Sequence, residues 1–262
     1  MNFSFKNKNV FITGATHGIG LECILDFASL GANVITFSRD KKKISDTKKK
    51  LNSIRAKYTI DEGDILDENF IHSYSKFVLK KHNRIDILIH NVGGGGRWGK
   101  DNFLETQYSV WNEVYDKNNK GLILFTKYFI PGMIKNKWGR VIAIGSICGA
   151  EARKEDRTWF NAAKSAQHAI IKSFSKKHLF TKKNITFNSV SPGPIFIKNT
   201  GWDTEKKKNK KKFKFVIDEL VPTKHIGIPQ DVSSLCCFLS SDYAKYINGS
   251  NMIIDGGMTN GI

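Results

Sequence analysis

The chain has 262 residues, with 42 Lys and Arg against 24 Asp and Glu, so its formal net charge is +18. This length fits one large α/β domain that buries a core without disulfides or metals. Its four cysteines are Cys23, Cys148, Cys236 and Cys237. They form no C-x-x-C pair and have no nearby histidines to complete a zinc site, so we expect no metal and a reduced, cytoplasmic setting. The start of the chain lacks an apolar signal core, and no apolar run approaches membrane-spanning length, so no membrane partner is expected.

The positive charge raises the alternative of a nucleic-acid partner. However, the excess is mostly Lys and is scattered over expected helix faces, as in Lys41–Lys43 and Lys48–Lys50. We therefore interpret it as a solvated surface and expect no nucleic acid. The exception is the Lys-rich segment from Glu205 to Phe215. It is either a solvated helix or mobile loop, or a basic lid over an anionic substrate.

Apolar runs alternate with amphipathic stretches along the chain, which is typical of βα units and a parallel sheet. Strands are predicted at Asn9–Thr13, Asn33–Phe37, Ala56–Ile60, Ile85–His90, Arg140–Ile144, Thr186–Val190 and Asn251–Ile254. Helices are predicted at Ile19–Leu30, Lys42–Ile54, Glu68–Lys81, Val110–Lys135, Trp159–Phe180 and Gln230–Leu239. Right-handed crossovers between such strands predict a single-domain Rossmann-type doubly wound sheet of about seven strands over residues 1–262, with ligands at the carboxyl ends of the strands.

The loop after the first strand is rich in glycine and opens a helix. Glycines permit a tight turn there, and they let backbone N–H groups approach a pyrophosphate at the helix N-terminus. The strand–turn–helix context makes this motif a strong indicator of a dinucleotide site. The residues expected to bind the cofactor are Gly14, Thr16, His17, Gly18, Ile19 and Gly20.

The second strand ends at Ser38 and Arg39, where an enzyme that uses NAD usually places an acidic residue. A guanidinium group suits a 2′-phosphate instead, and His17 in the first loop is expected to assist. The sequence therefore predicts NADP rather than NAD as the cofactor.

The loops after the next strands supply further polar and glycine residues. Asp64 and Ile65 follow the third strand and are expected to hold an adenine. The fourth strand is followed by Asn91, Val92 and Gly93, the fifth by Gly145 and Ser146, and the sixth by Pro192, Gly193 and Ile195. Each loop alone is ordinary, but their order and placement together indicate one site.

From Asn9 to Gly257 the chain resembles the compact type of the short-chain dehydrogenase/reductase family. The resemblance implies that Asn118 holds a relay water and that Ser146 hydrogen-bonds the substrate oxygen. It also implies that Lys164 binds nicotinamide-ribose hydroxyls and lowers the pKa of a catalytic Tyr. Pro192-Gly193 matches the loop that receives the nicotinamide, with a substrate loop at about 193–228, and Asp255-Gly256-Gly257 matches the closing D-G-G. The implied activity is NADP(H)-dependent interconversion of a carbonyl and a secondary alcohol.

Two positions depart from the family pattern. Phe160 stands where the family has its catalytic Tyr, and Ile197 stands where a Thr often contacts the cofactor, with Thr200 as a substitute. Three interpretations of Phe160 stay open: an engineered Tyr-to-Phe variant, a natural enzyme that uses another acid, or a catalytically impaired cofactor-binding protein. A water held by Asn118 and Lys164, or a group of the substrate, would be the other acid.

Aromatic and cationic residues offer two further expectations. Trp98, Trp159 and Trp202, with the cations Arg97, Lys100, Arg153, Lys154 and Arg157, either form a pocket for a small anionic, carbohydrate-like or carrier-bound substrate, or pack and face solvent. The resemblance implies a homotetramer or homodimer built on the two long helices. Their apolar residues, which alternatively only cover the sheet, are Leu122, Leu124, Phe125, Phe129, Ala166, Ala169, Ile170 and Phe174.

Overall fold

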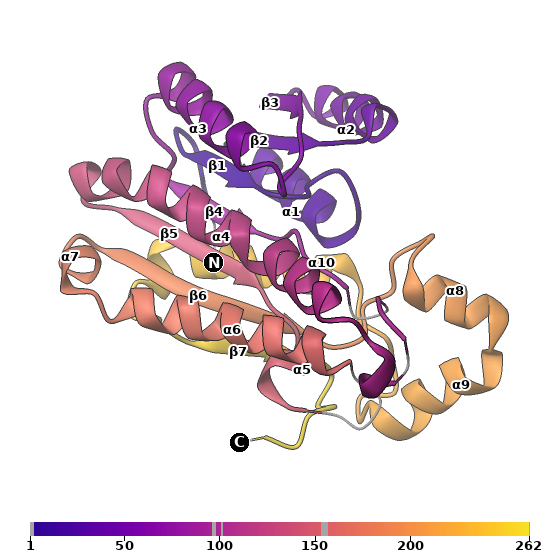
Figure 1. Cartoon of the computed structure of the whole chain (residues 1–262). Helices are drawn as coiled ribbons and strands as arrows, with labels where there is room; N and C mark the ends of the chain where they lie inside the picture. The colour runs from indigo at the N-terminus through magenta and orange to yellow at the C-terminus, as the bar shows by residue number, and fades with distance from the viewer. Residues whose placement is uncertain (1–2, 96–97, 101, 153–156, 262) are drawn as a thin grey trace.

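The computed structural model describes residues 3–95, 98–100, 102–152 and 157–261, which form a parallel sheet flanked by helices (Figure 1). The described strands are β1 (Asn9–Ile12), β2 (Asn33–Ser38), β3 (Lys57–Glu62), β4 (Ile87–His90), β5 (Gly139–Ile144), β6 (Ile185–Pro192) and β7 (Asn251–Ile254). They lie in the order β3-β2-β1-β4-β5-β6-β7, and Val10 of β1 pairs with Val34 of β2 and Ile87 of β4. The order reverses between β1 and β4, so the predicted doubly wound sheet is confirmed.

Helices cover both faces of this sheet. The described helices are α1 (Gly18–Ser29), α2 (Lys41–Ser53), α3 (Glu68–His82), α4 (Tyr108–Asn136), α5 (Ile147–Ala150), α6 (Thr158–Ser175), α7 (His178–Thr181), α8 (Gly201–Lys208), α9 (Lys210–Phe215) and α10 (Pro229–Ser240), with short turns η1 (Phe103–Glu105), η2 (Val216–Leu220) and η3 (Asp242–Ala244). One apolar core lies under α1, α2 and α10, and the other under α3, α4 and α6. None of the described helices has the length and apolar character needed to cross a bilayer.

The central strands β1, β4 and β5 are buried along almost their whole length because helices cover both faces of the sheet. Successive side chains of β1 point to opposite faces. Val10 and Ile12 therefore enter the core under α1, whereas Phe11 enters the core under α4. The Phe11 ring centroid lies 4.7 Å from that of Phe125 on α4. This two-sided packing positions both the first loop and α4 at the same edge of the sheet.

The helix predicted at Trp159–Phe180 is two helices in the structure. α6 ends at Ser175, and α7 begins at His178. The carbonyl of Ser175 accepts a hydrogen bond of 3.0 Å from the side-chain amide of Asn248, a residue far away in the sequence. A distant side chain thus satisfies an unpaired carbonyl at the end of α6, which local sequence does not reveal.

The Lys-rich segment forms a pair of helices that stands out from the layered body at the carboxyl edge of the sheet (Figure 1). Asn209 lies between the two helices. Its side-chain oxygen caps α9 by accepting a 3.0 Å hydrogen bond from the backbone N–H of Lys212. The pair is held by Trp202 and Phe213, whose ring centroids are 6.4 Å apart. The segment is therefore helical, as one of the two interpretations expected. Its role as a basic lid over an anionic substrate stays a prediction.

Candidate active site at the carboxyl edge of the sheet

The turn between β1 and α1 has the shape that a pyrophosphate cradle requires. Gly14 and Gly18 have φ angles of +67° and +56°, which favour glycine. A Cβ on Gly20 would lie 2.4 Å from the carbonyl oxygen of Gly14, so this close approach also needs glycine. The turn ends at His17, the extended residue that precedes α1, and at the unpaired N–H groups of the helix start. These residues fit the predicted dinucleotide phosphates.

The loop after β4 braces this turn. The side-chain amide of Asn91 donates hydrogen bonds to the carbonyls of Thr13, at 3.1 Å, and of Gly14, at 3.2 Å. In return, the hydroxyl of Thr13 accepts from the backbone N–H groups of Asn91 and Val92, both at 3.0 Å. The structure therefore joins two loops that the sequence separates by more than seventy residues.

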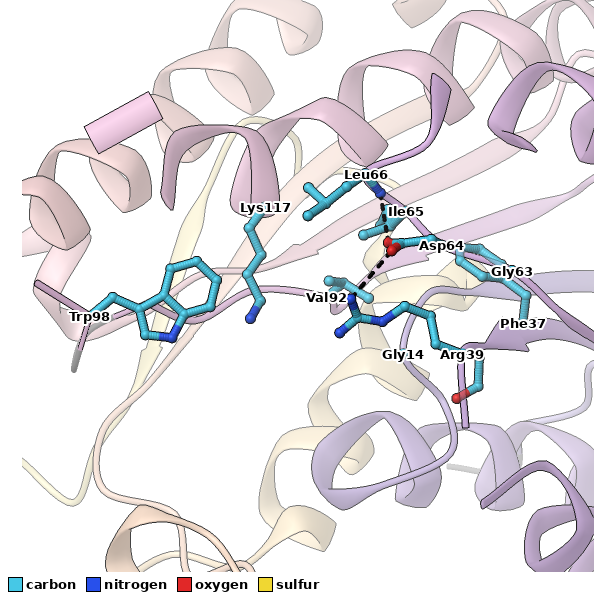
Figure 2. Close-up of a pocket in the computed structure, with 11 residues that line it drawn as sticks. Gly14, Phe37, Arg39, Gly63, Asp64, Ile65, Leu66, Val92, Trp98 and Lys117 are labelled. Carbon is cyan, nitrogen blue, oxygen red and sulfur yellow. Dashed lines mark hydrogen bonds and ion pairs between the residues drawn. The ribbon is translucent and has the colours of Figure 1, made fainter. Parts of the chain in front are cut away.

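A cavity of about 280 Å³ opens beside the turn, and Figure 2 shows its lining. Arg39 lies at its mouth and forms an ion pair of 3.3 Å with Asp64, whose other carboxylate oxygen accepts from the N–H of Leu66 at 2.9 Å. Ile65 lines the cavity as well, as predicted for an adenine site. The lining residues are Gly14, Phe37, Ser38, Arg39, Gly63, Asp64, Ile65, Leu66, Val92, Trp98 and Lys117.

Ser38 is fixed at the entrance of this cavity by short polar contacts. Its hydroxyl accepts from the hydroxyl of Thr16 and from the backbone N–H of Asp40, both at 3.2 Å. The predicted residues of the first two loops, Thr16 and Ser38, are thus in direct contact. This contact places the end of β2 against the glycine-rich turn.

Lys117 adds a second cation that the sequence analysis did not identify. Its Nζ lies 4.0 Å from the ring centroid of Trp98, and both side chains line the cavity (Figure 2). Partial burial lowers the pKa of Lys117, and the positive charge of Arg39 lowers it further, while Asp64 acts in the opposite direction. The positive charges of Arg39 and Lys117 therefore repel each other across the cavity, and an anion bound between them would reduce this repulsion.

Lys164 and Ser146 lie on neighbouring elements beyond β5. Lys164 is 4% exposed and donates to the carbonyl of Ile144 at 2.8 Å, and its burial lowers its pKa to about 7. Ser146 precedes α5 and accepts from the N–H of Cys148 at 3.2 Å, which leaves its own O–H able to donate. A Cβ on Gly93 would lie 2.9 Å from Lys164 Nζ, so the loop after β4 passes directly over this lysine.

Asn118 is fully buried, and its side chain supports the same loop. Its amide donates to the carbonyl of Gly94 at 2.8 Å, and its side-chain oxygen accepts from the N–H of Gly94 at 3.2 Å. The amide also donates to the carbonyl of Val114, one turn earlier on α4, at 2.7 Å. The side chain of Asn118 thus forms hydrogen bonds with the loop after β4 and with α4 itself.

Phe160 lies on α6 one turn before Lys164, as the sequence predicts. Its half-buried ring packs on the small apolar cluster of Val114, Trp159 and Ala163. Phe160 carries no hydroxyl, so it can neither donate nor accept a proton at this position.

The segment after β6 closes over the first turn. A Cβ on Gly193 would lie 2.6 Å from Cβ of Asp255, which requires glycine after Pro192. Ile195 is buried and forms a bridge with Gly227. A Cβ on Gly18 would lie 2.9 Å from the side chain of Ile197, so Ile197 covers the glycine-rich turn. The hydroxyl of Thr200 donates to the carbonyl of Ile197 at 2.7 Å and is engaged in this local contact.

The residues predicted to form a substrate pocket do not form one group. Trp159 is only 2% exposed, so of the two alternatives for this residue the structure shows the packing one. Trp98 lines the cavity beside the glycine-rich turn, and Trp202 lies on α8. Lys100 is paired with Glu105 at 3.0 Å. Arg97, Arg153 and Lys154 lie outside the described residues. Within the described ranges, the chain has no cluster of side chains able to hold a metal ion.

A model of the protein family described as Enoyl-(Acyl carrier protein) reductase matches residues 14–259. A 3-oxoacyl-(acyl-carrier-protein) reductase of Buchnera aphidicola subsp. Schizaphis graminum is 30% identical over 254 residues, which cover 97% of this chain and 98% of that protein. The corresponding reductase of Thermotoga maritima is 29% identical over 254 residues, with 97% and 98% covered.

The solved structure of L-sorbose reductase from Gluconobacter frateurii, complexed with NADPH and L-sorbose, has the same fold. Its TM-score is 0.90 at 24% identity, with 100% of both chains covered. The family match spans nearly the whole chain, from residue 14 to residue 259, and the strand order is that of a doubly wound sheet. The chain belongs to the short-chain dehydrogenase/reductase family of nicotinamide-dependent oxidoreductases.

Proposed function

We propose that this protein binds NADP(H) and interconverts a carbonyl and a secondary alcohol on a small anionic or carbohydrate-like substrate. The observation that carries the choice of cofactor is the pair of cations at the cavity beside the glycine-rich turn. Arg39 and Lys117 both line this cavity, and Asp64 is the carboxylate on its wall. A guanidinium and an ammonium group suit a 2′-phosphate better than they suit two ribose hydroxyls.

Each group of residues in the site has its own role in such a reaction. The bound cofactor supplies or accepts the hydride. The turn from Gly14 to Gly20 binds its phosphates, and Lys164 orients its ribose. The O–H of Ser146 donates a hydrogen bond to the substrate oxygen, where negative charge develops during reduction. Pro192 and Gly193 line the nicotinamide end.

The positive charge of the Lys-rich helices α8 and α9 favours the proposal that the substrate is anionic. The exposed Lys210, Lys211 and Lys212 lie on the pair that projects from the carboxyl edge. Positive charge near a site attracts anionic ligands. Relatives named for acyl carrier protein substrates and a structure complexed with L-sorbose are compatible with a carrier-bound acyl group or a sugar. The proposal also includes a cytoplasmic location, from the cysteine pattern.

A second candidate function is cofactor binding without efficient turnover. The observation that favours it is Phe160, which packs on apolar side chains where the family places its proton donor. This candidate predicts the same cofactor affinity as the first, so only rate measurements separate the two.

We expect Arg39→Ala to remove most of the preference for NADPH over NADH. A charge-assisted contact with the 2′-phosphate contributes about 1.5–3 kcal/mol, which corresponds to roughly 10–100-fold in affinity. Titration of both cofactors by fluorescence measures the preference. Lys42→Ala is the matched control, because it removes an exposed cation from the same region. Equal affinity of the unmodified protein for NADH and NADPH would refute the assignment of NADP.

We also expect a homotetramer, or a homodimer, that buries the outer faces of α4 and α6. Leu122, Phe125 and Phe129 are fully buried against the sheet, so for these three residues the alternative that they only cover the sheet holds. The outer faces instead expose Tyr115 and Ile123 on α4 and the small Ala162 and Ala169 on α6.

Light scattering of the unmodified protein should therefore report the mass of two or four chains. Ala169→Arg should shift the protein toward monomers, because a long cation replaces a small side chain where two helices approach. Lys127→Arg, at an exposed position of α4 that already carries a cation, should leave the mass unchanged. A monomer at micromolar concentration of the unmodified protein would contradict this expectation.

A further inference from the structure

Gln167 connects Lys164 to Asn118 inside the core. Its side chain is fully buried and lies one helical turn after Lys164 on α6. Its amide nitrogen donates to the backbone carbonyl of Asn118 at 2.9 Å, and its amide oxygen accepts from Lys164 Nζ at 3.1 Å. The two contacts use opposite ends of one amide group, so a single side chain bridges α6 and α4 behind the site.

The carbonyl of Asn118 has a second partner on the far side. His90 Nε2 lies 2.9 Å from this oxygen. A carbonyl only accepts, so the proton of His90 is on Nε2. Burial lowers the pKa of His90 to about 3, and the charge of Lys164 contributes to this decrease, so the ring is neutral near pH 7. The carbonyl of Asn118 thus accepts from both His90 and Gln167.

Lys164 is similarly engaged on its inner side. An ammonium group has three N–H donors. One is directed to the carbonyl of Ile144 and a second to Gln167. Gly93 lies close to the same Nζ, on the side of the cofactor loops. One donor is therefore left to face the site, and the other two hold the ammonium group in place.

We propose that Gln167 is a positioning residue that takes the place of a water between Lys164 and Asn118 and closes the rear of the site. The proposal deepens the proposed function, since Lys164 is the ribose-binding residue of that site. A primary amide neither gains nor loses a proton near neutral pH, so it holds Lys164 without carrying protons from solvent. Any proton that a reaction consumes must then enter from the open, substrate side.

The first test measures the titration of Lys164 in the protein without added cofactor, by ¹³Cε NMR, with the signal assigned from its loss in Lys164→Met. Gln167→Glu places a carboxylate beside Nζ and should raise the midpoint by about one pH unit or more. Gln167→Met keeps the length but removes the acceptor, and should lower the midpoint. Identical midpoints in the unmodified protein and both variants would overturn the proposal. Circular dichroism checks folding, and either variant alone suffices for the comparison.

The second test is a crystal structure of Gln167→Ala. Removing the amide leaves room and two polar partners for a water. We expect an ordered water within hydrogen-bond distance of both the Asn118 carbonyl and Lys164 Nζ, and none in Gln167→Met. An empty or collapsed site in Gln167→Ala would contradict the replacement of a water by Gln167. Neither test needs turnover or bound NADPH, so a failure of the proposed function, seen as no NADPH binding, is distinguishable from a failure of this inference.

Discussion

Phe160→Tyr should raise kcat for carbonyl reduction by about 10²-fold or more. General acid–base help contributes roughly 10²–10⁴-fold. Without a hydroxyl at this position, the substrate oxygen receives a hydrogen bond from Ser146 only, so the charge that develops on it is poorly neutralised. The affinity for NADPH should change little, because the restored interaction acts in the transition state rather than on cofactor binding. Single-turnover oxidation of NADPH, screened over carbonyl substrates for both forms, measures the difference.

Phe103→Tyr is a matched control for this rate measurement, since it adds the same hydroxyl to an exposed ring outside the site. It should leave kcat unchanged. A Phe160→Tyr variant no faster than the unmodified protein, on a substrate that both bind, would show that Phe160 has another role. Fast turnover by the unmodified protein would point to a different acid, such as a group of the substrate.

The gain from Phe160→Tyr should increase when Gln167 is also replaced by Ala. A water would then occupy the space behind Lys164. Water can pass protons along, whereas the amide of Gln167 cannot. The double-mutant cycle of these two changes measures their coupling. Additive effects would mean that the rear of the site does not influence the proton step.

The affinity for NADPH should fall steeply as the pH rises above 7. Burial lowers the pKa of Lys164 to about 7 in the free protein. Ribose hydroxyls favour the ammonium form, so the pKa of Lys164 is higher in the complex and binding takes up a proton above pH 7. The Kd should therefore rise by up to about tenfold per pH unit until the pH reaches the pKa of the complex. Fluorescence titration at several pH values from 7 to 9 measures this slope.

Lys164→Met is the control for the pH dependence. It should bind NADPH more weakly at pH 7 but with little change up to pH 9, because the titrating group is gone. Working above pH 7 also avoids the titration of the 2′-phosphate, whose second pKa is about 6. A slope in Lys164→Met equal to that of the unmodified protein would show that another group is responsible.

Strand positions were predictable from sequence because burial on both faces produces short, continuous apolar runs between turn residues. The predicted strand Asn33–Phe37 is β2, extended by Ser38, and Asn251–Ile254 is β7. Helix ends were less predictable. α6 stops at Ser175, where Asn248 reaches across from another loop. The doubly wound sheet of about seven strands was predicted from the crossover rule and is confirmed.

The sequence by itself determined the fold class, the glycine-rich turn, the candidate pair Ser146 and Lys164, and the presence of Phe at position 160. These features are local, since each depends on residue types at short spacing within one strand, turn or helix. They predict a nucleotide site, and they define the question that Phe160 raises about catalysis.

Only the tertiary structure decided which groups surround that local framework. Lys117 of α4 and Arg39, which follows β2, line the same cavity although 78 residues separate them in the chain. Gln167 contacts the carbonyl of Asn118 because α4 and α6 pack side by side. Trp159 is a core residue because it packs against Val114 of α4 and Ala163 of α6. Such contacts join residues far apart in the chain, and their geometry depends on how helices pack on the sheet, which residue types at short spacing do not specify.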